Sequence, residues 1–452
     1  MTLSAERSQS LRAELDALRL EYAGKIGAED AEYIRTVRAV ARISRAAGRL
    51  LIHFSLEPVS WGAGVVALGT YKVLENMEIG HNVLHGQYDF MHDPELSSAS
   101  YEWDMVGTAK SWKRAHNATH HVFTNVIGRD RDFGYNAFRF SEEVPWKPIH
   151  LLQPLVSPLS GLVFEYSIGA YDLGLLDGLG PRSSGAPGGK RRPREVAHDL
   201  WAFARKAARK SFVEYVFYPA LAGPLAVKVL AGNLAANVLR NAWAYAVIYC
   251  GHLTEKTATF REEDLAGEDR AGWYVRQVMG SSNFEIGRLG HVLSGHLGFQ
   301  IEHHLFPNIP ARRYPEMAPR VRAICEKHGL PYTTGSLASQ FASAMRRLVR
   351  FAVPGRATGP HAERLVATPA GAARRASWLG SDGRSVRARR SPQEVSMPTY
   401  EFLCRRCEKR FTAEMHIAEH DRGVAKCPTC HRKDRVDKTL STFTPVTSHK
   451  SA

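Results

Sequence analysis

The chain has 452 residues, of which 44% are hydrophobic, so it is long enough for two or three domains with a large core. Its formal net charge of +15 is typical of proteins that meet nucleic acid or an anionic membrane surface. With only six cysteines, a disulfide framework is not expected. The polar opening "MTLSAERSQS" differs from a signal peptide, which predicts a cytoplasmic start.

The first 44 residues are predicted to form an amphipathic cytosolic segment, with one helix over residues 9–45. Leu11, Leu15 and Leu18 recur at i, i+4 and i+7. Such a face either packs on a domain or lies on a membrane surface, and packing is the commoner reason for the pattern.

Two long apolar zones come next. Residues 50–74 are interrupted by Glu57-Pro58, so they fit either one crossing of about 20 residues or a short hairpin. Residues 151–173 are predicted to lie along a membrane surface, or to dip in and return. This keeps the number of membrane crossings between His121 and His252 even, so that the segments around these two histidines lie on the same side of the membrane.

A third apolar zone, 212–251, is long enough for two crossings joined at Gly232-Asn233, although Arg240 within it must then face protein. Basic segments at 181–195 and 205–210 precede this zone and predict a cytoplasmic position. They could also attract anionic lipid or coenzyme A phosphates, but topology control is the simpler role.

Histidine is concentrated in four short segments. These are "GHNVLHGQYDF", "WKRAHNATHHVF", "YCGHLTEK" and "SGHLGFQIEHHLFP", which contain His81, His85, His116, His120, His121, His252, His296, His303 and His304. Residues four apart share a helix face, so the larger groups can each aim two imidazoles at one point. Together they could hold two metal ions with about eight or nine nitrogens, and imidazole suits Fe, Zn, Cu or Ni.

Two further patterns lie near these motifs. His296, Gln300, His303 and His304 fall at i, i+4, i+7 and i+8, which predicts one helix face. The stretch "IGRDRDFG", with Asp130 and Asp132, resembles part of a calcium loop but lacks the later ligands, so it is predicted to be a turn.

The motifs H-x-x-x-H, H-x-x-x-H-H and Q-x-x-H-H, spread over apolar zones, resemble those of the integral-membrane fatty acid desaturases. The stretches "ENMEIGHNVLHGQYDFMHDPE", "EWDMVGTAKSWKRAHNATHH" and "FQIEHHLFPNIPARRYPE" are similar to the bacterial acyl-CoA desaturase branch. The resemblance covers roughly residues 45–345, within a predicted domain of 45–354. It implies an all-α membrane protein, a helical transmembrane bundle with a cytosolic, histidine-rich di-metal cap.

In that family two irons held by histidines activate O₂ and remove two hydrogens from an acyl chain. The resemblance implies metal ligation by His81, His85, His116, His120, His121, His252, His303 and His304, with His296 and Gln300 as candidate ligands or neighbours of ligands. Trp103 and Trp112 are candidates for lining the slot of the acyl chain, and plain packing is the alternative. A saturated, stearoyl-type acyl-CoA is the expected substrate.

Other functions fit parts of the pattern. A di-iron hydroxylase or ketolase would use the same scaffold, while a membrane metal transporter would place its ligands at mid-membrane, not beyond the apolar zones. No "HPGG" haem motif or Gly-rich dinucleotide fingerprint is present, so a separate reductase, ferredoxin or cytochrome b₅-type donor is expected. The expected location is the inner or plasma membrane, with the active site and both termini cytoplasmic and no nucleic acid partner.

The C-terminal part has a different composition. Residues 355–396, rich in Arg, Ala, Gly and Pro, are predicted to be a disordered basic linker. The block 397–452 contains two C-x-x-C pairs, Cys404, Cys407, Cys427 and Cys430, whose spacing predicts a structural zinc ribbon. It resembles the small FmdB-type regulatory zinc ribbons. An iron-bearing, rubredoxin-like electron donor is the alternative, but the gap between the pairs is short for one.

Overall fold

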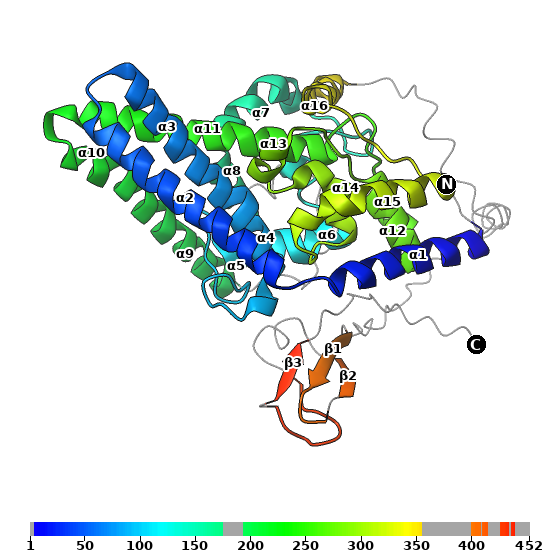
Figure 1. Cartoon of the computed structure of the whole chain (residues 1–452). Coiled ribbons are helices and arrows are strands. Elements are labelled where there is room, and N and C mark those ends of the chain that lie inside the picture. Colours follow the sequence, from blue (N-terminus) through cyan, green and yellow to red (C-terminus); the bar gives the residue numbers. More distant parts are fainter. Residues whose placement is uncertain are drawn as a thin grey trace. The chain divides into compact units, whose positions relative to one another are not determined.

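The structure, a computed structural model, describes residues 4–174, 193–354, 399–407, 409–414, 425–433 and 435–438. The chain divides into two compact units, one spanning Ala5–Thr358 and one that holds the described C-terminal residues. The larger unit is helical and the smaller contains a three-stranded sheet (Figure 1). The predicted linker, 355–396, lies outside the described residues.

The predicted helix over residues 9–45 is two helices, α1 (Ala5–Ala23) and α2 (Ala28–Phe54). The prediction of one helix was wrong because Gly24 and Gly27, which have low helix propensity, separate them. The Asp30 carboxylate accepts a hydrogen bond from the Gly27 backbone N–H at 3.0 Å and stabilises the start of α2.

The apolar face of α1 packs on the rest of the helical unit. Leu11 and Leu15 are fully buried. The Asp16 carboxylate accepts a hydrogen bond at 2.6 Å from Tyr274 in α12 (Arg270–Met279). The packing alternative for this helix is therefore confirmed.

The first apolar zone is part of a helical hairpin. The Glu57 carboxylate accepts a hydrogen bond from the Ser60 backbone N–H at 2.6 Å, and Pro58 opens α3 (Pro58–Leu74), where proline removes no helical hydrogen bond. Helices α2 and α3 pack closely, since a Cβ atom on Gly48 would lie 2.5 Å from the Leu68 backbone nitrogen. Of the two alternatives for this zone, the structure has the hairpin.

The third apolar zone turns earlier than predicted. Helix α9 (Pro193–Phe212) continues through the π-helical segment η6 (Val213–Phe217) and α10 (Tyr218–Leu221), and α11 (Ala226–His252) runs back. The turn includes Gly223, at φ +52°, and not Gly232-Asn233. A Cβ on Gly232 would lie 2.8 Å from the Ile52 side chain, so this glycine allows α11 to pack on α2.

The second apolar zone is broken into short helices. These are η5 (Pro148–Leu152), α7 (Gln153–Leu162) and α8 (Phe164–Asp172), with Val163 at φ −115° and ψ 31° between the last two. Leu155 and Leu159 are exposed on α7.

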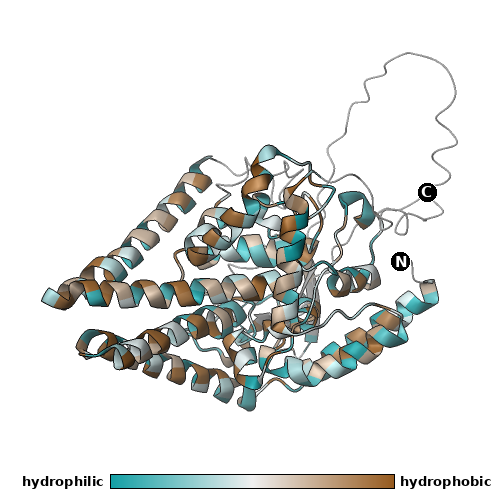
Figure 2. Cartoon of the chain, turned by 90° about the horizontal axis from the view of Figure 1, so that it is seen from above, coloured by the Kyte–Doolittle hydropathy of each residue, from teal (hydrophilic) through white to brown (hydrophobic). Residues whose placement is uncertain are grey.

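None of the described helices combines the length and the apolar character needed to cross a bilayer. Figure 2 shows hydrophilic residues interspersed along the long helices. The transmembrane part of the expected architecture, including the crossings within 212–251, remains a prediction.

Further helices and helical segments belong to the larger unit. They are η1 (Glu75–His81), α4 (Asn82–Leu84), α5 (Ala109–Ala115), η3 (His116–His120), α6 (His121–Phe123), α13 (Arg288–Leu293), α14 (Gln300–Leu305), α15 (Tyr314–Lys327) and α16 (Leu337–Ala352).

The smaller unit has three antiparallel strands in the order β2-β1-β3. They are β1 (Thr399–Cys404), β2 (Lys409–Glu414) and β3 (Val436–Lys438). Phe402 is buried and stacks on Phe411, with ring centroids 5.6 Å apart. Among the described residues of this unit the buried core is small and includes Cys404 and Cys427, so its cysteines contribute to its packing.

Candidate metal centre and adjoining cavity

Two of the histidine segments are π-helical, η1 at the end of α3 and η3 at the end of α5. A π-helix bonds residue i to i+5, and such segments occur mostly at functional sites. In η3 this geometry places His116 beside His121, with their Nε2 atoms 3.2 Å apart. The rings of His81 and His85, which follow one another along η1 and α4, have centroids 4.7 Å apart.

All eight histidines predicted as ligands lie in one cluster. Their ligand atoms form groups within 4.8 Å, namely His81, His85, His116 and His303 in the first, and His120, His252 and His304 in the second, with His121, His303 and His304 as a third, overlapping group. Helix α11 ends at His252, the short helix α14 carries His303 and His304, and α3 continues into η1, which ends at His81. The arrangement offers two neighbouring positions for metal ions.

The histidine nitrogens are suited to bind metal. The Nε2 atoms of His85, His303 and His304 are buried and have no hydrogen-bond partner among the described residues. Burial lowers the pKa of His81 to about 4 and that of His252 to about 3. His81 and His252 are therefore neutral at pH 7, and each has an unprotonated ring nitrogen, which fits two metal ions with nitrogen ligands.

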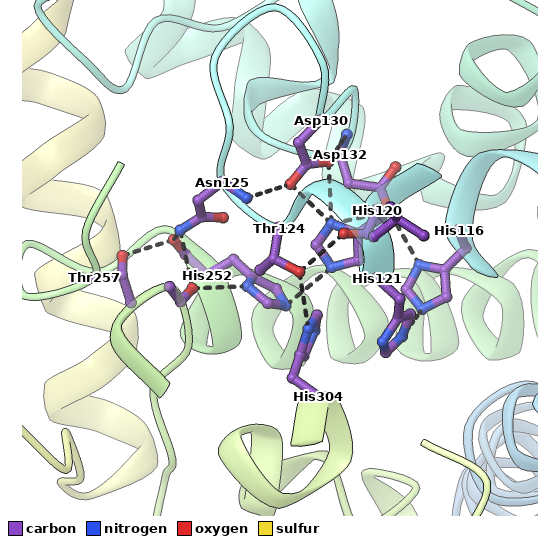
Figure 3. Close-up of polar contacts among 12 residues, drawn as sticks. His116, His120, His121, Thr124, Asn125, Asp130, Asp132, His252, Thr257 and His304 are labelled. Carbon is purple, nitrogen blue, oxygen red and sulfur yellow. Dashed lines mark hydrogen bonds and ion pairs between the residues drawn. The ribbon is translucent and has the colours of Figure 1, made fainter. Parts of the chain in front are cut away.

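Two carboxylates orient the histidines of the second motif. Asp132 accepts a hydrogen bond from His116 Nδ1 at 3.0 Å, and Asp130 accepts one from His120 Nδ1 at 2.9 Å (Figure 3). These bonds place the proton on Nδ1 and leave Nε2 for a metal. Burial by itself would lower the pKa of His120, but the carboxylates of Asp130 and Asp132 raise it.

The segment 127–134 is a turn, as predicted, but the sequence analysis missed the role of its carboxylates. The Asn125 backbone N–H donates to Asp130 at 2.7 Å, and the Tyr171 hydroxyl donates to Asp132 at 2.5 Å. A usable signal was the D-x-D pattern directly after a histidine motif, because ligating histidines need such acceptors.

Other histidines use neutral acceptors. His252 Nδ1 lies 3.1 Å from the Gly280 carbonyl oxygen, and His304 Nδ1 lies 2.9 Å from the Gln277 side-chain oxygen (His252 and His304 in Figure 3). Both oxygens can only accept, so the proton lies on Nδ1 and Nε2 is again the unprotonated nitrogen. Gln277 belongs to α12, and nothing in its sequence context marks it.

His296 does not share a helix face with the last histidine pair, so that prediction was wrong. His296 has φ 55°, in the left-handed region, and α14 begins only at Gln300. His296 Nδ1 lies 3.0 Å from Glu78 and belongs to none of the metal-ligand groups. Gln300 lies at the second group, where its side-chain Nε2 is 2.8 Å from His252 Nε2.

A cavity adjoins the cluster. Its wall includes Trp103, Trp112, Met77, Met105, Phe164 and Leu297, together with His81, His116, His120 and His252. Trp112 stacks on His116 with ring centroids 4.5 Å apart, and Trp103 lies 5.2 Å from Trp112. Both tryptophans predicted as lining residues are thus in the wall of an apolar space beside the histidines.

The four cysteines of the smaller unit form their own group. Their sulfur atoms lie within 4.8 Å of one another, and Cys404 Sγ is 3.6 Å from Cys430 Sγ. Four thiolates around zinc at about 2.3 Å would be about 3.8 Å apart, so the cluster fits a tetrahedral ion. The Thr429 backbone N–H donates to Cys427 Sγ at 3.4 Å, as in a metal-binding knuckle.

Buried histidines around two candidate metal positions, beside an aromatic-walled cavity, are the arrangement expected of a metalloenzyme with an apolar substrate. The sequence model of the family described as "Fatty acid desaturase" matches residues 58–336. The NADPH-dependent stearoyl-CoA 9-desaturase of Mycobacterium tuberculosis is 39% identical over 351 residues, which cover 76% of this chain and 80% of that protein.

More distant relatives are similar over shorter regions. Human fatty acid desaturase 3 is 25% identical over 54% of this chain and 51% of its own length. The sn-1 linoleoyl-lipid 6-desaturase of Synechocystis is 24% identical over 60% of this chain and 74% of its own length. The chain belongs to the fatty acid desaturase family and is an oxidoreductase of lipid metabolism.

Proposed function

We propose that the protein inserts a double bond into a saturated acyl chain in an O₂-dependent reaction, with a stearoyl-type acyl-CoA as substrate. The observation that carries the proposal is the convergence of eight histidines beside an apolar cavity. The name of the Mycobacterium tuberculosis relative supports the choice of acyl-CoA.

Two iron ions are the proposed cofactor. His81, His85, His116 and His303 would hold one and His120, His252 and His304 the other, with His121 between them. Bound there, the irons supply the O₂ chemistry that removes two hydrogens from the acyl chain. The unpartnered Nε2 atoms and the Nδ1 acceptors support this assignment.

The other residues of the site bind and shield the substrate. The stacked Trp112 and its neighbour Trp103 present flat apolar surfaces to an alkyl chain and hold it beside the histidines. Burial of the cluster excludes water from the reacting carbon atoms. No side chain needs to act as a general base in this proposal.

We propose that the electrons come from a separate donor. The relative from Mycobacterium tuberculosis is named NADPH-dependent, and this chain has no Gly-rich dinucleotide motif. We therefore expect a reductase, with or without a ferredoxin or cytochrome b₅-type carrier, to pass electrons from NADPH to the site.

We further propose a membrane location with a cytoplasmic site. Apolar side chains are exposed at two adjacent helix turns, where Leu56 is 93% and Val227 is 77% accessible. The turns are joined by a hydrogen bond of 3.2 Å from Trp61 Nε1 to the Lys228 carbonyl oxygen. Such an exposed patch is costly in water and favourable in lipid.

The cysteine cluster is proposed to hold a structural zinc ion. Its four thiolates have the distances of a zinc ribbon, and the resemblance to FmdB-type ribbons favours a regulatory role over electron transfer.

Expression in a desaturase-deficient host, followed by lipid profiling, tests the proposed function. The wild-type chain should produce unsaturated chains and sediment with membranes, and His120→Ala should produce none, because it removes a ligand of the second metal position. His198→Ala is the matched control, since this histidine is 71% exposed in its side chain and lies outside the cluster. Equal products from wild type and His120→Ala would reject the proposal, and an added oxygen in place of a double bond would identify a hydroxylase.

A further inference from the structure

One wall of the cavity is an irregular segment, residues 102–107, between α4 and α5. It contributes Trp103 and Met105 to the cavity. A segment without helix or strand hydrogen bonds has no ladder to hold it, so its buried carbonyl groups need donors from elsewhere. Trp103 Nε1 donates to the Gly107 carbonyl oxygen at 2.8 Å within the segment, and the other donors come from neighbouring helices.

Two lysines of α9 supply the donors. Lys206 Nζ donates to the Trp103 carbonyl oxygen at 3.0 Å and to the Gly107 carbonyl oxygen at 2.9 Å. Lys210 Nζ donates to the Asp104 carbonyl oxygen at 2.8 Å and to its carboxylate at 2.6 Å. The side chains of both lysines are mostly buried, with 22% and 11% exposed.

A third cation reaches the segment from α11. Arg240 is fully buried, and its Nη1 lies 3.2 Å from the Met105 sulfur. Its Nη2 is paired with the Glu165 carboxylate at 2.6 Å. Buried ion pairs are often no more stabilising than apolar side chains of similar size, so their presence here calls for a reason other than stability.

We propose that Lys206, Lys210 and Arg240 are positioning residues that hold the Trp103–Met105 wall, and so fix which carbon atoms of the acyl chain lie beside the histidine cluster. The inference rests on the proposed desaturase function. It concerns the position of the double bond. If the wall were displaced along the cavity, a neighbouring carbon–carbon bond of the same acyl chain would lie beside the histidine cluster. A displacement of about 1 Å is enough to change a rate by about a hundredfold.

The test compares the double-bond positions formed by full-length variants from palmitoyl-CoA and stearoyl-CoA. Mass spectrometry of cleaved products gives the isomer ratio, and initial rates give kcat and KM. For Lys210→Met we expect the ratio of minor to major isomers to rise by about tenfold, with Lys210→Arg restoring the wild-type ratio. Arg209→Met is the matched control, because Arg209 is an exposed neighbour on the same helix.

Each outcome of this experiment supports or overturns the positioning role of the lysines. A lower rate with an unchanged isomer ratio in Lys210→Met would overturn the inference, because a merely structural residue gives that result. If Lys210→Met does not accumulate as folded protein, the isomer ratio of Lys206→Met decides instead. If neither variant folds, the lysines are structural and the inference is overturned. If the wild type forms no double bond, the proposed function fails first, which separates the two cases.

Discussion

At the scale of single residues, the site depends on which nitrogen of each histidine carries the proton. Five of the eight clustered histidines have an acceptor at Nδ1, namely His81, His116, His120, His252 and His304. An acceptor there fixes the tautomer and the ring plane, so Nε2 is presented to a metal without a further conformational search. The acceptors therefore orient the candidate metal ligands, and one of them, Asp132, also lies within 4.8 Å of the ligand atoms of His116 and His120.

Replacing an acceptor should weaken metal binding. Asp132→Ala removes the partner of His116 Nδ1 and should lower metal affinity by about 10–100-fold, as is usual when such partners are lost. Metal content per chain after dialysis against a chelator measures the effect. Glu263→Gln is the control because its side chain is 76% exposed, and equal metal retention in both variants would contradict the assigned role of Asp132.

The histidines could be predicted from sequence, and the D-x-D pattern was a signal for Asp130 and Asp132, but the acceptors on other elements could not be predicted. The motif spacing of His81, His85 and the later histidines depends only on local chain geometry. Gln277 reaches His304 through the packing of α12 on α14, which no local pattern encodes. The spacing of His296 predicted a shared helix face, but its left-handed backbone interrupts the expected helix, and the spacing does not reveal this.

At the scale of elements, close helix packing positions the site. The hairpin of α2 and α3 leads directly into η1, which carries His81. Glycine at the interface permits the close approach, as the 2.5 Å clash of a Cβ on Gly48 with the Leu68 nitrogen indicates. The hairpin turn could be predicted from Glu57-Pro58, whereas the turn near Gly223 was missed because Gly232-Asn233 resembles a turn but serves packing.

Gly48→Ala should push α2 and α3 apart. The methyl group would overlap backbone atoms that cannot rotate away, so we expect a loss of about 1–3 kcal/mol in the free energy of unfolding. Gly62→Ala in α3 is the matched control, because nothing lies within 4 Å of its Cβ position. There alanine should be neutral or stabilise by up to about 1 kcal/mol. Thermal denaturation that ranks the two variants in the opposite order would refute the packing argument.

At the scale of the whole molecule, the chain contains two ligand sets of different chemistry. The histidine cluster belongs to the unit Ala5–Thr358, and the cysteine cluster belongs to the C-terminal unit. Neutral imidazoles suit iron, and four thiolates suit zinc in a closed structural site. The two sets share no residue, so the metal can be removed from either set without altering the ligands of the other.

Cys427→Ser in the full chain should therefore abolish zinc binding and leave the iron content and the desaturation products unchanged. Elemental analysis of the purified protein and lipid profiling of the expressing cells measure the two effects. Loss of unsaturated products from this variant would mean that the C-terminal unit takes part in the reaction, as an electron carrier would. Retained zinc would mean that these cysteines are not its ligands.

The π-helical segments make the site sensitive to chain length. Each residue of a helix turns the chain by about 100° about the axis. His116 and His121 meet because η3 closes its turn over five residues. A deletion of one residue between them would restore an ordinary helix and rotate every later side chain away from its partner. The number of residues between these two imidazoles is therefore fixed by the geometry of η3, and we expect an insertion there to separate them as a deletion would.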